Sequence, residues 1–290
     1  MTAAAYRGYE GVPPEQVERL SKFRSEHPCK RIDVAGVTWE YILSGNGTDV
    51  LLVLSGGLRV AEAAFVLIQM FDDDYRVVAP TYPPLGTMGE LVDGVVAILD
   101  AEQVSEAFVL GQSYGGVVAQ VLMQRYPSRV KKVVLSGTVP LIEVRWKKYL
   151  NSLVLAIVTL LPERVVMSLY KRILSPIVTV QKSERTFWKA YLEELFEQHL
   201  SKADLLSHLH TNLDAQANYV YTGGAKSSWH GDVLVVWGEN DHLRTERGRK
   251  GMEDIFPQAQ IHVIAGGGHT VAMSEPVKYA AAVKGFLGKR

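Results

Sequence analysis

Strand-like and helix-like segments alternate through the first half of this 290-residue chain. The strands are short apolar runs and the helices are longer amphipathic stretches, in the order 50–57, 61–71, 75–80, 88–102, 107–113, 115–126 and 130–137. Strands separated by helices pair in parallel, and the connecting helices cover both faces of the sheet. The pattern therefore predicts an α/β protein with a doubly wound, mostly parallel sheet.

Further strands are expected before and after this central pattern. Residues 31–44 alternate apolar and polar side chains around a glycine-containing turn, which predicts an antiparallel hairpin. Near the C-terminus, strands are expected over 232–241 and 259–266, and helices over 246–255 and 275–287. The hairpin and the six other strands together predict a sheet of eight strands.

The strand pattern is interrupted between residues 141 and 228, where all the periodicity is helical. We expect residues 141–228 to form a helical cap inserted into an α/β core made of 30–140 and 229–290. Residues 1–29 precede this core as an N-terminal extension with a short helix that starts after a proline pair.

The longest apolar run of the cap spans residues 153–161 and is followed directly by Pro162. A bilayer-spanning helix needs about 20 apolar residues, roughly twice this length. We therefore expect no membrane span here, and instead a buried or pocket-lining helix.

Composition narrows the classes of partner and the compartment. Basic and acidic side chains balance at 31 each, so nothing electrostatic favours nucleic acid. Cys29 is the single cysteine, which rules out an intrachain disulfide. The N-terminal residues lack the basic start and apolar run of a secretory signal. These features predict a cytoplasmic protein.

One motif points to nucleophilic chemistry. Gly111-Gln-Ser113-Tyr-Gly115 matches G-x-S-x-G, with an apolar strand before it and a helix rich in Val, Ala and Leu after it. Flanking glycines let the backbone turn sharply, which projects the serine hydroxyl out of the sheet at the N-terminus of the helix. Without chemistry, the same stretch would be only a tight turn.

A serine hydroxyl needs a base, and that base needs a group to orient it. Asp241 follows one predicted strand and His269 follows the last, after three glycines. Parallel strands present their C-terminal ends at one edge of the sheet, so both side chains are expected near Ser113. Glu239 stays open as an alternative acid, with Asp241 preferred.

These residues resemble the motifs of the α/β-hydrolase superfamily. The likeness runs from about Arg31 to the C-terminus and includes the serine turn, the G-x-x-D of 238–241, the Gly-His pair ending at 269 and the helical insertion. The resemblance implies that Ser113 is the nucleophile, that His269 is the general base and then acid, and that Asp241 fixes the imidazole tautomer.

The resemblance also implies an oxyanion hole made of two backbone N–H groups. One belongs to Tyr114, and the other to Gly57, with Leu58 as the alternative. The chain departs from a common pattern of the superfamily here, because Ser55 stands where many members have histidine. A side-chain change leaves backbone donors in place, so this departure bears on the subfamily more than on catalysis.

Aromatic residues of the cap are candidates for lining a substrate pocket, although aromatic residues at helical spacing are often simple core. They are Trp146, Phe187, Trp188 and Tyr191. No metal site is expected, because His208 and His210 lie two apart on a predicted helix and point to different faces. No organic cofactor is implied.

The resemblance predicts a serine hydrolase that cleaves a carboxylic ester or a related acyl compound with a hydrophobic portion. Lactonases and carbon–carbon bond hydrolases use the same three residues, so both remain alternatives. A noncatalytic binding member of the fold is a further alternative, because the 55–59 loop bears a loose likeness to the adaptor-like maspardin. The sequence leaves open whether a second copy of the chain is a partner.

Overall fold

The computed structural model describes residues 8–143, 145–222 and 224–288, without the side chains of 145–148. Its strands form one eight-stranded sheet in the order β1-β2-β4-β3-β5-β6-β7-β8. Their bounds are β1 Lys30–Val34, β2 Val37–Ser44, β3 Val50–Leu54, β4 Arg76–Pro80, β5 Ala107–Gln112, β6 Val130–Ser136, β7 Asp232–Gly238 and β8 Gln260–Ile264. Within the described ranges, β1–β2 and β2–β4 are the only antiparallel pairs of this sheet. The predicted fold class is confirmed.

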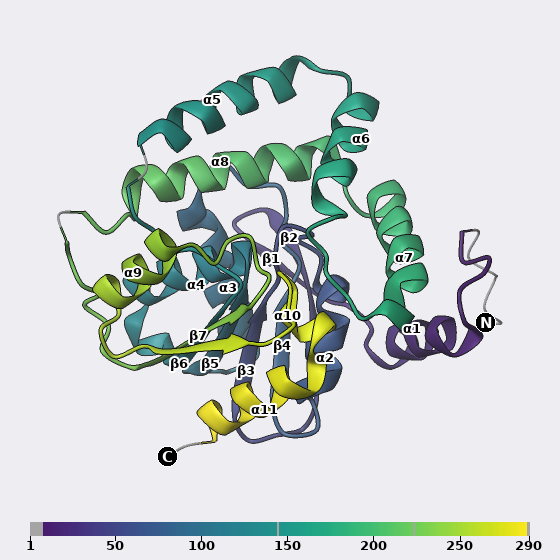
Figure 1. Cartoon of the computed structure of the whole chain (residues 1–290), viewed down its shortest axis with the longest axis horizontal. Coiled ribbons are helices and arrows are strands. Elements are labelled where there is room, and N and C mark those ends of the chain that lie inside the picture. The colour runs from purple at the N-terminus through teal and green to yellow at the C-terminus, as the bar shows by residue number, and fades with distance from the viewer. Residues whose placement is uncertain (1–7, 144, 223, 289–290) are drawn as a thin grey trace.

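Helices cover both faces of this sheet (Figure 1). The N-terminal extension contributes α1 Pro14–Glu26, and the helices of the core are α2 Phe65–Phe71, α3 Met88–Ala101, α4 Tyr114–Arg125, α9 Glu246–Ile255, α10 Val271–Ser274 and α11 Pro276–Leu287. Alternate residues of β3 serve the two faces: Leu51 and Val53 pack in one hydrophobic core, whereas Leu52 and Leu54 pack in the other. The first core includes α2 and α11, and the second includes α3, α4 and α9. Burial on both sides explains why β3 is apolar throughout.

Among the described residues between β6 and β7, four α-helices follow one another in the chain. They are α5 Arg145–Leu160, α6 Glu163–Leu174, α7 Arg185–Gln198 and α8 Lys202–Asn218. α8 packs on α3, and α5 packs on the outer side of α8, so α5 is the helix farthest from the sheet in Figure 1.

The N-terminal segment is tied to this helical region. The Tyr9 hydroxyl donates a 2.6 Å hydrogen bond to Glu194 on α7, and Arg19 forms an ion pair with Glu184. Tyr9 also belongs to the hydrophobic core that contains Phe187. The extension therefore braces α7 against the body of the protein.

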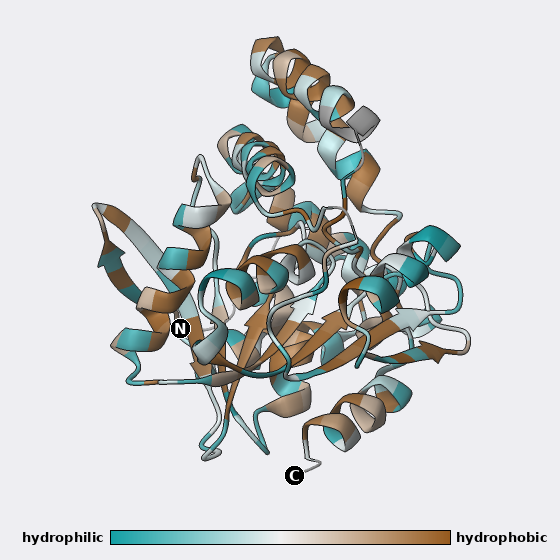
Figure 2. Cartoon of the chain, turned by 90° about the vertical axis from the view of Figure 1, so that its left-hand side faces the viewer, coloured by the Kyte–Doolittle hydropathy of each residue, from teal (hydrophilic) through white to brown (hydrophobic). Residues whose placement is uncertain are grey.

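The expectation of a buried or pocket-lining helix over 153–161 was wrong. No described side chain of α5 is buried, and Leu160 is 86% exposed. The physical reason is that α5 has a neighbour on one side only, and its other side faces outward (Figure 2). None of the described helices is long and apolar enough to cross a membrane.

Candidate active site

Ser113 occupies a strained turn between β5 and α4. Its backbone has φ 52° and ψ −115°, a conformation that costs a non-glycine residue about 1–3 kcal/mol. A hydrogen bond to the neighbouring strand holds this strained conformation: the Ser113 N–H donates to the Ser136 carbonyl at 2.8 Å. A Cβ at Gly115 would lie 2.0 Å from the Leu54 carbonyl oxygen, and one at Gly111 would lie 2.5 Å from the Gly115 carbonyl oxygen. The flanking glycines are thus required by close backbone approach.

Three side chains from the C-terminal edge of the sheet form a continuous hydrogen-bonded chain. The Ser113 Oγ lies 3.0 Å from His269 Nε2, and His269 Nδ1 lies 3.0 Å from Asp241 Oδ1. Asp241 follows β7 and His269 follows β8, so two separate loops bring them to the serine. The structure brings together the three residues that the sequence proposed.

The surroundings of Asp241 favour its ionised form. Its side chain is fully buried, and burial acts to raise the pKa. Hydrogen bonds from His269 and from the Leu243 N–H outweigh burial, so the pKa of Asp241 lies below its ordinary value. The alternative acid, Glu239, is exposed and accepts a hydrogen bond from the Gly266 N–H. The structure therefore pairs His269 with Asp241 and leaves Glu239 in the neighbouring turn.

The candidate oxyanion donors also gather around the serine. Gly57 and Leu58 line a cavity that includes Ser113, and Tyr114 begins α4. In the described part of the chain, neither the Gly57 nor the Tyr114 N–H donates to a backbone carbonyl. The Gly57 carbonyl is held by the Tyr170 hydroxyl at 2.7 Å, which fixes the loop. These two amides are thus free to donate to a ligand.

The cavity beside Ser113 has mostly apolar walls. Its apolar lining residues are Leu58, Ala63, Ala64, Leu67, Leu174, Ile177, Val178 and Met273. A ligand with a hydrophobic portion fits such walls. Three of the lining residues, Leu174, Ile177 and Val178, lie at the end of α6 or just after it. They could not be singled out from the sequence, because an apolar pattern does not distinguish a cavity wall from core.

Three of the four predicted aromatic pocket residues, Phe187, Trp188 and Tyr191, do not line the two described cavities that contain Ser113. Phe187, Trp188 and Tyr191 are buried on α7 and pack with Phe65 of α2, at ring-centroid distances of 5.3 to 6.0 Å. They serve as core because α7 turns this face toward α2. The side chain of Trp146 lies outside the described residues.

Two residues of α8 that the sequence did not place at the site also lie beside Ser113. His208 and Asn212 lie in a second hollow next to Ser113, and the ring of His208 lies 4.3 Å from that of Tyr114. Burial, with a smaller contribution from the charge of Arg59, lowers the pKa of His208 to about 3. His208 is therefore neutral at physiological pH. Only the fold places His208 beside Ser113, because nothing in its local sequence pattern points there.

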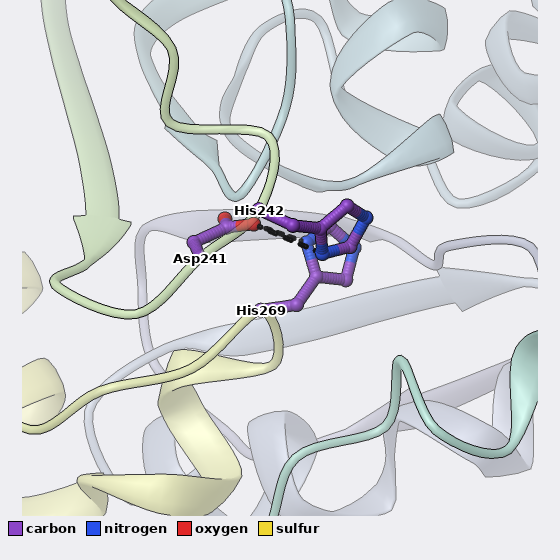
Figure 3. Close-up of side chains that lie close together, drawn as sticks. All are labelled: Asp241, His242 and His269. Carbon is purple, nitrogen blue, oxygen red and sulfur yellow. Dashed lines mark hydrogen bonds and ion pairs between the residues drawn. The ribbon is translucent and has the colours of Figure 1, made fainter.

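A metal would have to compete with the hydrogen bonds of the site. Asp241, His242 and His269 place one ligand atom each within 4.8 Å of one another (Figure 3). Both ring nitrogens of His269 already face partners, Asp241 on one side and Ser113 on the other. His242 is more than half exposed. The donor set is thus better matched to proton transfer than to metal binding.

The fold and this edge of the sheet define a class of protein: a doubly wound α/β protein with serine, histidine and aspartate hydrogen-bonded at the C-terminal ends of its strands. The family model described as alpha/beta hydrolase fold matches residues 50–276. The chain therefore belongs to the α/β-hydrolase fold family, as its resemblance predicted.

Several known proteins are similar to this chain. The dihydrolipoyllysine-residue acetyltransferase component of the acetoin cleaving system of Cupriavidus necator is 24% identical over 88% of this chain and 68% of that protein. Esterase YbfF of Escherichia coli is 24% identical over 70% of this chain and 76% of its own length. The crystal structure of the enol-lactonase from Burkholderia xenovorans has a TM-score of 0.73 and 14% identity, covering 90% of this chain and all of that one. This last likeness shows the fold alone.

Proposed function

We propose that the protein is a serine hydrolase that cleaves a carboxylic ester or a related acyl compound. The observation that carries the proposal is the unbroken hydrogen-bonded chain from Ser113 through His269 to Asp241. A base within hydrogen-bond reach, itself oriented by a carboxylate, is what a serine nucleophile requires. The similarity to an esterase supports an ester bond as the target.

In the proposed mechanism, the Ser113 oxygen attacks the acyl carbonyl as His269 Nε2 takes its proton. The N–H groups of Tyr114 and Gly57 stabilise the resulting oxyanion, aided by the positive end of α4. Protonated His269 gives its proton to the departing alcohol, leaving an acyl-enzyme. Water, deprotonated by His269, then hydrolyses the ester of Ser113 and restores the free serine.

The apolar cavity supports a substrate with a hydrophobic acyl portion. The acyl chain would lie against Leu67, Ile177 and Met273, which line the cavity that contains Ser113. Each buried methylene contributes about 0.8 kcal/mol. We therefore expect kcat/KM to rise with acyl-chain length until the cavity is filled.

The test is labelling of the purified protein with a fluorophosphonate probe, followed by turnover of p-nitrophenyl esters of increasing acyl length. Ser113→Ala is the matched control, because it removes only the hydroxyl oxygen. We expect labelling and turnover that both disappear in Ser113→Ala. Absence of Ser113-dependent labelling and turnover would instead favour a noncatalytic binding protein. A panel extended to lactones and vinylogous diketones separates the esterase proposal from its two hydrolase alternatives.

A further inference from the structure

The outward side of α5 and α6 exposes an unusual amount of apolar surface. Ten large hydrophobic side chains are exposed among the described residues, and eight of them lie on these two helices. Leu153, Ile157 and Leu160 on α5 and Val165, Leu169 and Ile173 on α6 form what we call the α5–α6 surface. Scattered single residues would be ordinary, but their concentration on two consecutive helices points to an interaction site.

The exposed residues form one stripe on each helix. Residues 153, 157 and 160 are spaced by four and three, and residues 165, 169 and 173 by four, so each set shares a face. The opposite side of α5 carries Val154, Leu155 and Val158, which are half-buried toward α8. α5 is therefore apolar on two sides, although no described side chain of it is buried. A helix that is apolar on more than one side is normally surrounded by protein core or by lipid.

α5 does not reach this lipid environment by spanning the bilayer. α5 has 16 residues, and none of the described helices can cross a membrane. An apolar stripe of this length beside polar residues fits a helix that lies in the plane of a membrane surface, with its apolar side among the acyl chains.

The charge of this region distinguishes between two candidate partners, a membrane and a second copy of the chain. The whole sequence is neutral, yet residues 145–174 contain six basic residues and one acidic residue, Glu163. Arg164 and Arg172 are exposed and each directly precedes a residue of the apolar stripe on α6. Lys171 is paired with Glu193 of α7 and does not add to the free charge.

A symmetric dimer would place this basic region against its own copy, because a two-fold interface uses the same patch on both partners. Like charges facing one another oppose that contact. Anionic lipid headgroups are complementary to the basic residues, and acyl chains are complementary to the stripe.

We propose that the α5–α6 surface docks on anionic membrane surfaces. The two helices lie in the interface plane, the leucines and isoleucines enter the acyl region, and Arg164 and Arg172 contact phosphate headgroups. The surface ends next to the catalytic candidate, because Ile173 belongs to it and the adjacent Leu174 lines the cavity of Ser113. The docking itself does not depend on hydrolytic activity.

The test is flotation of the full-length protein with vesicles of phosphatidylcholine, with or without phosphatidylglycerol. We expect the wild type to float with the anionic vesicles, and less of it to float as salt rises. Leu160→Glu should lower the partition coefficient at least about tenfold, because it removes one leucine side chain that would be buried among the acyl chains. The double variant R164E/R172E should lose at least about tenfold on anionic vesicles and little on neutral ones.

Val277→Glu is the matched control, because Val277 is 81% exposed on α11, away from this surface. It should float like the wild type, and all variants should unfold at the same temperature because each altered side chain is exposed. Failure of the wild type to float, or equal loss in Val277→Glu and Leu160→Glu, would overturn the proposal. Light scattering that shows a dimer broken by Leu160→Glu, without vesicle binding, would assign the surface to self-association instead.

Discussion

The guanidinium of Arg59 lies in the protein interior, 5.9 Å from the centre of the Tyr114 ring. Arg59 is fully buried, and its Nη2 donates to the Pro83 carbonyl and to the Ser207 hydroxyl. No carboxylate forms an ion pair with it in the part of the chain that the structure describes. A positive charge without a counter-ion therefore lies close to the side chain of Tyr114, the residue whose amide we propose as an oxyanion donor.

This charge should stabilise the oxyanion. We expect Arg59→Met to lower kcat on p-nitrophenyl esters about tenfold with KM little changed, because the negative charge develops only in the transition state. Arg59→Lys keeps the charge and should retain most of the activity. Both variants keep a non-glycine residue at position 59, where φ is 61°, so we expect the same backbone cost in each. Equal losses in the two variants would show that packing, and not charge, is responsible.

The pairing of His269 with Asp241 predicts unequal effects of the two nearby acids. Asp241→Asn should lower kcat by about 10⁴-fold, because an amide no longer holds the imidazole in the tautomer that accepts the serine proton. Glu239→Gln should stay within a few-fold of the wild type, because Glu239 contacts only the neighbouring turn. Steady-state kinetics on one ester measures both. A large loss in Glu239→Gln with a small one in Asp241→Asn would reverse the assignment.

The turn around Ser113 should not tolerate a methyl group at Gly115. Gly115→Ala would bring Cβ within 2.0 Å of the Leu54 carbonyl oxygen, and we expect a loss of at least about 2 kcal/mol in the free energy of unfolding. Gly285→Ala on α11 is the control, because its Cβ would meet nothing within 4 Å. That change should stabilise the protein by about 0.5–1 kcal/mol. Urea denaturation followed by circular dichroism measures both, and a Gly115→Ala protein as stable as the wild type would contradict the crowding.

The lowered pKa of His208 predicts that the protein becomes less stable as the pH falls below neutral. Between its ordinary value of 6.5 and about 3, the unfolded chain binds a proton that the folded protein does not, so stability falls as pH falls through this range. On going from pH 7.5 to 5.5, the wild type should lose about 1 kcal/mol more than His208→Leu. Urea unfolding at the two pH values gives this difference directly. Equal losses in both proteins would mean that His208 is protonated alike in the folded and unfolded states.

The order of strands and helices could be predicted because each element carries its own periodicity. The apolar run of β3 and the glycines around Ser113 are local consequences of burial and close backbone approach. The approach of Asp241 and His269 to Ser113 was also predictable, because parallel strands end at one edge.

The walls of the cavity and the environment of the cap helices were not predictable in this way. Phe187 and Leu174 are both apolar residues on helices, yet one is core and the other lines the cavity. Leu160 sits in an apolar run that suggested burial, and it is exposed. A helical pattern shows that one face is apolar, but it does not identify what that face meets.

By itself, the sequence determined the α/β architecture, the strained serine turn and the identity of the three residues at the sheet edge, because each depends on local pattern or on the common direction of parallel strands. Only the tertiary structure decided that Arg59 and His208 lie against the ring of Tyr114, and that α5 turns an apolar side outward. These relationships join segments up to about 150 residues apart, as the contact of Arg59 with Ser207 shows. They depend on how helices pack on one another, which residue periodicity does not encode.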